Sequence, residues 1–367
     1  MNGYLVLENG RYFRGKLLND CRMAGGEVVF STAMISYQDI ITDPSYYGQI
    51  VVMTYPLVGN VGFNEKSFAS RTAMVKGLVL REATDFPSHY EMETDLISFL
   101  NRSEIAVLTG VDTRALTRAI RHEGSMGGVI IDNIDDMEWL VDKARLAVEE
   151  LQGDLVRFVS RKNIMKFGNG TKKIVLLDLG TKKGVIDSLV RRDCEVIAVP
   201  AATGAREILR LHPDGIMVSD GPGDPGAISY AIDTCRELLG RVPLFGVGLG
   251  HQILALAMGA STLRLPYGHR GSNHPVKSLE NQRVYITTQN HGFSLEESSL
   301  IGTGIDVTMR SLNDGSIEGI KHREMPVFSV QFDPEGYPGY SETGFFYDDF
   351  ITRLNMSPAS LSGQSSY

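Results

Sequence analysis

Residues 241–260 read RVPLFGVGLGHQILALAMGA, which places a tight, glycine-bounded turn between an apolar strand and an apolar helix. A strand, a sharp turn and a helix in this order form a nucleophile elbow, in which the central residue of the turn attacks a carbonyl group. The central residue here is Gly248, which has no side chain. Downstream, SVQFDPEGYPG carries Asp333 where this chemistry would use histidine as its base. The pattern predicts a site laid out for covalent amide chemistry, with its attacking and proton-transferring groups replaced.

Size and composition fit a globular protein of two domains. The chain has 367 residues, of which 43% are hydrophobic and 22% charged, and a net charge of -8. This charge, without a basic run, argues against nucleic acid or an anionic membrane as the main partner. No stretch has the roughly 18 apolar residues of a membrane span, and the N-terminus lacks a signal-peptide pattern. We therefore expect a cytoplasmic protein, and the cysteine and histidine spacing predicts no metal site.

The two halves of the chain differ in their predicted order of strands and helices. The first half opens with a hairpin pattern, LVLENGRYFRGKLL, and ends before a polar, glycine-rich segment at 166–173 that is interpreted as a linker. The second half alternates strands and helices, as in KIVLLDLG, KKGVIDSLVRRD and CEVIAVPA, which predicts a parallel sheet with helices on both faces. Ligands bind at the carboxyl ends of such strands. The loops SDGPGDP, GVGLGHQ and VQFDPEG are expected to converge there.

Longer motifs run in order through both halves. The first half contains GEVVF, YQDIITDPSYYGQIVVMTYPLVGN and GVDTRALTRAIR, and the second contains SDGPGDP, FGVGLGHQILALAMGA, GHRGSNHPV, TTQNHGFSLE and SVQFDPE. Together they resemble the small subunit of carbamoyl-phosphate synthetase, whose second domain is a class I glutamine amidotransferase. The resemblance implies an α/β protein. We therefore expect an N-terminal mixed α/β domain with β-hairpins that contacts the large subunit (1–165), a linker (166–173), a parallel-sheet amidotransferase domain (174–357) and a tail (358–367).

The family hydrolyses the side-chain amide of glutamine. By the resemblance, a cysteine attacks the amide, a histidine serves as its base, and a glutamate orients the histidine. These roles map onto Gly248, Asp333 and Glu335, so only the orienting position is retained. His251 of the GHQ motif is interpreted as a packing residue, and a water activated by Asp333 is a further option for the attacking group. Loss of a triad nucleophile costs about six orders of magnitude in turnover, so we expect no useful glutaminase activity.

The groups that would bind glutamine are better preserved than those that would cleave it. The resemblance implies that the loop glycines let backbone approach the ligand and that Leu249 supplies an N–H for the oxyanion. Loss of the cysteine side chain enlarges the cavity, so glutamine binding without cleavage is one option that the sequence leaves open. Asp220 stands where relatives usually have asparagine. The implied glutamine-binding residues are Ser45, Gly221, Gly223, Leu249, Gln252, Asn290, Gly292 and Phe293.

Three functions follow from this resemblance. The first is a small subunit without glutaminase activity that assembles with the large subunit and supports synthesis from free ammonia, for arginine and pyrimidine biosynthesis. ATP and Mg²⁺ are expected on the large subunit, and no cofactor is expected in this chain. The second is a glutamine-binding regulatory module. The third is an active amidotransferase that uses a non-standard residue.

Overall fold

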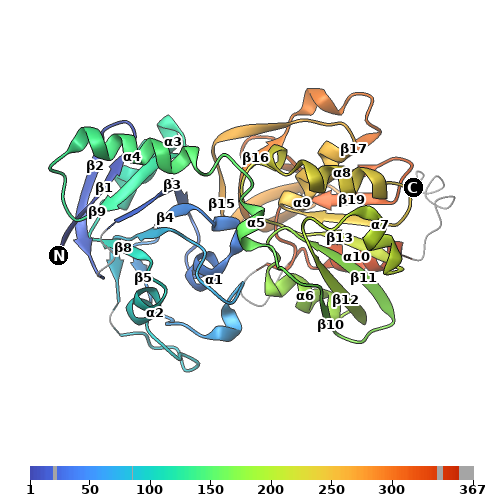
Figure 1. Cartoon of the computed structure of the whole chain (residues 1–367), viewed down its shortest axis with the longest axis horizontal. Coiled ribbons are helices and arrows are strands. Elements are labelled where there is room, and N and C mark those ends of the chain that lie inside the picture. Colours follow the sequence, from blue (N-terminus) through green and yellow to red (C-terminus); the bar gives the residue numbers. More distant parts are fainter. Residues whose placement is uncertain (20–22, 85, 337–341, 355–367) are drawn as a thin grey trace. The chain divides into compact units, whose positions relative to one another are not determined.

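The computed structural model describes residues 1–19, 23–84, 86–336 and 342–354, which form two compact units (Figure 1). The first unit comprises residues 1–153 and 266–271, and the second comprises the other described residues. The segment 166–173 was predicted to be a linker, but it belongs to the second unit and includes parts of two strands. Strand β10 (Met165–Phe167) pairs with β12 (Cys194–Pro200), and β11 (Lys172–Asp178) already begins at Lys172. Its glycines serve close packing, because a Cβ atom on Gly170 would lie 2.1 Å from the carbonyl carbon of Asp193. The predicted tail at 358–367 lies outside the described residues.

The first unit is built on a closed barrel in the order β1-β2-β8-β6-β4-β3-β9. The predicted N-terminal hairpin is confirmed, since β1 and β2 pair antiparallel and Gly10 in their turn has a φ of 82°. Closure leaves the barrel without a free edge. The barrel strands are β1 (Asn2–Leu7), β2 (Tyr12–Leu17), β3 (Met23–Ser31), β4 (Gln49–Met53), β6 (Gly77–Val79), β8 (Ala106–Thr109) and β9 (Met126–Ile131).

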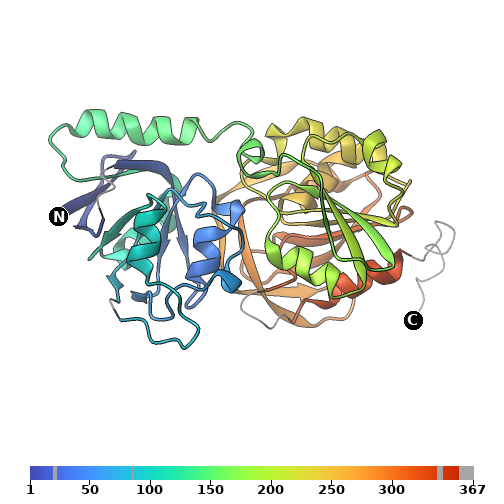
Figure 2. The ribbon, with the colours of Figure 1, turned by 60° about the horizontal axis from the view of Figure 1, so that its bottom comes forward.

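Helices and short segments cover this barrel. The longest helix, α4, lies along the strands in Figure 2 and packs Leu140 and Ala144 against Val129 and Ile131 of β9. These apolar side chains are buried, as expected for the inner face of an amphipathic helix. The remaining elements of the unit are α1 (Tyr37–Thr42), η1 (Pro44–Tyr46), β5 (Leu57–Val58), η2 (Glu65–Ser67), β7 (Glu82–Ala83), α2 (Leu96–Arg102), α3 (Thr113–Glu123) and α4 (Met137–Glu149).

The second unit has a ten-stranded sheet in the order β10-β12-β11-β13-β14-β19-β18-β17-β15-β16. The predicted parallel sheet is confirmed for β12, β11, β13, β14 and β19. The whole sheet is mixed, because β10 joins one edge antiparallel and β18, β17 and β15 continue the other edge antiparallel. Besides β10, the strands of this sheet are β11 (Lys172–Asp178), β12 (Cys194–Pro200), β13 (Gly215–Val218), β14 (Leu244–Val247), β15 (Thr262–Ser278), β16 (Val284–Leu295), β17 (Ile305–Ser311), β18 (Ile317–His322) and β19 (Val327–Val330).

Helices cover both faces of the parallel strands, as the alternating pattern predicted (Figures 1 and 2). One face packs against α5, α7, α8 and α9, and the other against α6 and α10. Among the described residues, no helix has the length and apolar character that crossing a membrane requires. The helices of this unit are α5 (Val156–Val159), α6 (Lys183–Val190), α7 (Ala205–Arg210), η3 (Pro225–Ala227), α8 (Ser229–Leu238), α9 (Leu249–Ala257), η4 (Glu297–Leu300) and α10 (Phe345–Arg353).

Candidate functional site

The predicted elbow is present between β14 and α9. Gly248 has φ 56° and ψ −116°, a conformation that strongly favours glycine, and its N–H donates to the carbonyl of Val330 at 3.0 Å. The turn is held tightly against β13. A Cβ atom on Gly250 would lie 2.1 Å from the carbonyl oxygen of Val218. The backbone therefore has the geometry that presents a nucleophile, without a side chain to present.

The Asp220 carboxylate lies at this turn. Its Oδ1 accepts a hydrogen bond of 2.8 Å from the backbone N–H of Leu249, at the first residue of α9. A Cβ atom built on Gly248 would lie 2.1 Å from that Oδ1 and 2.3 Å from Cγ of Asp220. The carboxylate is 4% exposed, and its charge is favourable beside the positive end of the helix. The predicted contact between the loops after β13 and β14 is thus confirmed.

The base position carries an ion pair. Lys182, which precedes α6, places its ammonium nitrogen 2.5 Å from Oδ1 of Asp333 and 3.3 Å from Oε1 of Glu335. All three side chains are less than a tenth exposed. The Tyr347 hydroxyl donates to Oε2 of Glu335 at 2.8 Å. Burial, reinforced by the Glu335 carboxylate, raises the pKa of Tyr347 well above its usual value, so this phenol remains a proton donor.

This cluster suits charge pairing better than proton transfer. A general base must be able to accept a proton from the attacking group, and the closest cation to Asp333 in the cluster is a buried lysine that stabilises the ionised carboxylate. Sequence reasoning missed Lys182 and Tyr347. A signal for the lysine was present, since LDLGTKK puts it just after β11, at the same sheet edge as the three predicted loops.

The retained binding positions serve the packing of the unit. A Cβ atom on Gly221 would lie 2.2 Å from the carbonyl oxygen of Leu179, and Gly223 has a φ of 94°, so both positions need glycine. The side-chain amide of Gln252 donates to the Phe293 carbonyl and to Oε1 of Gln331, both at 2.9 Å. Gln252 is 2% exposed and ties α9 to β16.

The other predicted binding residues are divided between the units. Asn290 and Gly292 alternate with Phe293 on β16, all three partly buried. Ser45 lies in the first unit, where its backbone N–H and its hydroxyl both donate to Oδ1 of Asp43, at 2.8 and 2.7 Å. The contact of these four residues with glutamine stays a prediction.

Three buried side chains could be considered as substitutes for the nucleophile: His251 and the two described cysteines, Cys194 and Cys235. His251 is fully buried with Nδ1 2.9 Å from the Ser329 hydroxyl, and burial lowers its pKa to about 3, which fits the predicted packing role. Burial raises the pKa of Cys194 to about 11 and that of Cys235 to about 12, so neither thiol ionises near neutral pH. Cys194 lies at the amino end of β12, whereas the elbow follows the carboxyl end of the parallel strand β14.

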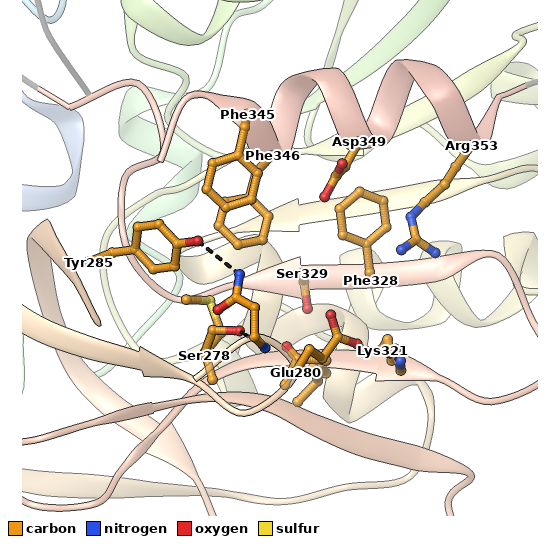
Figure 3. A pocket seen from close by; sticks show the side chains of 14 residues that line it. Ser278, Glu280, Tyr285, Lys321, Phe328, Ser329, Phe345, Phe346, Asp349 and Arg353 are labelled. Atoms are coloured by element: carbon orange, nitrogen blue, oxygen red, sulfur yellow. Dashed lines mark hydrogen bonds and ion pairs between the residues drawn. The ribbon is translucent and has the colours of Figure 1, made fainter. Parts of the chain in front are cut away.

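A pocket of about 140 Å³ lies elsewhere in the second unit (Figure 3). The rings of Phe345 and Phe346 stack above it, and Asp349 and Arg353 come from the same helix, α10. None of the residues predicted for amide chemistry lines this pocket. Its lining comprises Ser278, Glu280, Asn281, Tyr285, Thr308, Met309, Ile320, Lys321, Phe328, Ser329, Phe345, Phe346, Asp349 and Arg353.

Comparison with known proteins gives matches to both units. The family model described as carbamoyl-phosphate synthase small chain, CPSase domain, matches residues 5–130, and that described as glutamine amidotransferase class-I matches residues 175–353. The carbamoyl phosphate synthase small chain of Staphylococcus epidermidis is 44% identical over 96% of this chain and 95% of its own length. That of Listeria monocytogenes is 45% identical over 96% of each chain. A pyrimidine-specific small chain from Halalkalibacterium halodurans is 45% identical over 97% of this chain and 98% of its own.

Proposed function

Because this chain belongs to the carbamoyl-phosphate synthase small chain family, we propose that it is the small chain of such a synthase and that it has lost glutamine hydrolysis. It binds the large chain, which supplies the ATP and Mg²⁺ chemistry. The complex takes free ammonia to form carbamoyl phosphate for arginine and pyrimidine biosynthesis. The chain serves this complex as a structural and regulatory subunit.

The proposal rests on what the structure places at the nucleophile position and at the base position. At the elbow, the Asp220 carboxylate fills the volume where a side chain at Gly248 would begin. At the base position, Asp333 is paired with the buried Lys182. Attack on an amide carbonyl needs a nucleophile and a group that takes its proton, and these two substitutions remove both. The buried, weakly acidic thiols of Cys194 and Cys235 support the same conclusion.

Retained assembly is supported by the full-length match. The first unit carries the region that matches the small-chain CPSase model, and no large part of it is missing relative to the relatives. The first unit is therefore the part proposed to contact the large chain.

The test is carbamoyl phosphate synthesis by the chain co-expressed with its large chain, with either ammonium or glutamine as nitrogen donor. The proposal expects synthesis with ammonium and none above background with glutamine. Equal synthesis with glutamine would contradict it and favour an amidotransferase with a non-standard residue. A stable complex whose ammonium-dependent rate responds to added glutamine, without glutamine consumption, would favour the regulatory module instead.

A further inference from the structure

We propose that the Asp220 side chain blocks the elbow, so that the amide group of glutamine cannot bind there. This blocking side chain is called the Asp220 plug. This inference rests on the proposed function for the identity of the excluded ligand, and goes beyond it by naming the residue that excludes it. Loss of a nucleophile alone prevents cleavage but leaves a glutamine-binding pocket. The Asp220 plug removes the binding of the amide as well.

The Asp220 plug occupies the hydrogen bond that the amide carbonyl of glutamine would need. In amide hydrolysis at an elbow, the carbonyl oxygen of the substrate accepts from the backbone N–H that follows the nucleophile. That N–H belongs to Leu249, and it donates to Oδ1 of Asp220 at 2.8 Å. A carbonyl oxygen brought to the same place would lose this donor and would face a carboxylate. Both effects oppose binding of the amide in the orientation that leads to cleavage.

The Asp220 plug also occupies the space beside Gly248. A Cβ atom on Gly248 would lie 2.1 Å from Oδ1, 2.3 Å from Cγ and 2.9 Å from Cβ of Asp220. Separations below 3.0 Å require something to move, so the carboxylate of Asp220 takes the space from which an attacking side chain would project. Glycine at 248 and aspartate at 220 are therefore a matched pair. Restoring a side chain at 248 would not restore the site unless Asp220 also moved.

Burial and the N-terminal end of α9 hold the Asp220 plug in place. Asp220 follows β13, is 4% exposed, and its carboxylate caps a nine-residue helix at the end where backbone N–H groups lack partners within the helix. A carboxylate is stabilised there by the helix dipole more than a neutral amide is. Asparagine, usual at this position by the family resemblance, would be released more readily for a ligand.

A double-mutant cycle tests the occupation of space. Gly248→Ala is measured by thermal unfolding of the full chain, alone and combined with Asp220→Ala. The unfavourable backbone angles of Gly248 penalise alanine equally in both backgrounds, so they cancel. We expect Gly248→Ala to lower Tm by about 5 °C more when Asp220 is present. The matched control, Asp224→Ala, changes another carboxylate of the same loop, whose Oδ1 accepts from the N–H of Gly226. Coupling near zero, or equal coupling to Asp224→Ala, overturns the proposal.

Glutamine titration by calorimetry tests the consequence. The Asp220→Asn and Asp220→Ala variants are expected to bind glutamine at least about tenfold more tightly than the native chain, because one hydrogen bond contributes about that much to affinity. The control variant Asp224→Asn should leave the affinity unchanged. Affinity for glutamine that does not rise in either Asp220 variant overturns the proposal. The proposed loss of hydrolysis and the proposed Asp220 plug can be refuted independently. Ammonia release by the native chain would end the proposed loss of hydrolysis, whereas zero coupling in an inactive chain would end only the plug.

Discussion

The ammonium nitrogen of Lys182 lies 2.5 Å from Oδ1 of Asp333, and both side chains are buried at the position where the resemblance places a catalytic base. A buried carboxylate is costly unless a positive charge lies beside it, and Lys182 supplies that charge to Asp333 and Glu335 together. The site thus has a stable charge arrangement of its own. It therefore differs from a triad in which two residues are simply absent.

Removing the cation should destabilise the chain strongly. Lys182→Met keeps most of the side-chain volume but leaves two buried carboxylates without their ammonium partner. We expect the free energy of unfolding to fall by about 3–5 kcal/mol, the range for breaking a buried pair. Urea denaturation measures it. The control is Lys183→Met, one residue further on, where the lysine is exposed and the change should stay within about 0.5 kcal/mol. Equal effects of the two variants would contradict the role assigned to Lys182.

Stability should fall with acid because of His251. Burial lowers its pKa from 6.5 to about 3, so below pH 6.5 the unfolded chain binds a proton that the native chain does not. The stability from this group is complete above pH 6.5 and is lost as pH falls towards 3, at about 1.4 kcal/mol per unit. Between pH 7.5 and 5, His251→Gln should lose about 2 kcal/mol less than the native chain. Exposed His89, changed to Gln, is the control. Parallel pH profiles for native and His251→Gln would show the prediction to be wrong.

Packing of the elbow should tolerate no side chain at Gly250. Alanine has a higher helix propensity than glycine, but a Cβ atom at this position would lie 2.1 Å from the carbonyl oxygen of Val218. We expect Gly250→Ala to cost about 3 kcal/mol in denaturant unfolding, the upper end for overpacking. Gly204→Ala is the comparison, since a Cβ there has nothing within 4 Å. Similar stabilities for the two variants would mean that the turn can move away from β13.

The second unit was largely predictable from its strand–helix alternation. Apolar runs such as KIVLLDLG specify buried parallel strands, and a parallel sheet places their carboxyl ends together, so the convergence of Asp220 and Gly248 could be inferred. The antiparallel strands escaped this reasoning. Strand β15 contains two prolines and two glycines, and its pairing is decided by distant partners instead of by local pattern.

The barrel and the charge cluster depend on contacts far apart in the sequence. Closure of the first unit joins β1 to β9, more than a hundred residues away, and no local signal records it. Lys182 and Asp333 are likewise separated by 151 of the 367 residues. The sequence predicted that Gly248 and Asp333 stand at two positions where the family resemblance expects catalytic groups. The structure adds that the Asp220 carboxylate lies against Gly248 and that Lys182 pairs with Asp333.

The most direct test of the central claim is the release of ammonia from glutamine by the chain in complex with its large chain. Ammonium-dependent carbamoyl phosphate synthesis by the same preparation shows that the complex is folded and competent. We predict release no faster than in a sample without the small chain, because no nucleophile is presented at Gly248 and Asp333 is held by Lys182. Release well above that background, abolished by Asp333→Asn, would contradict the account and assign Asp333 a catalytic role.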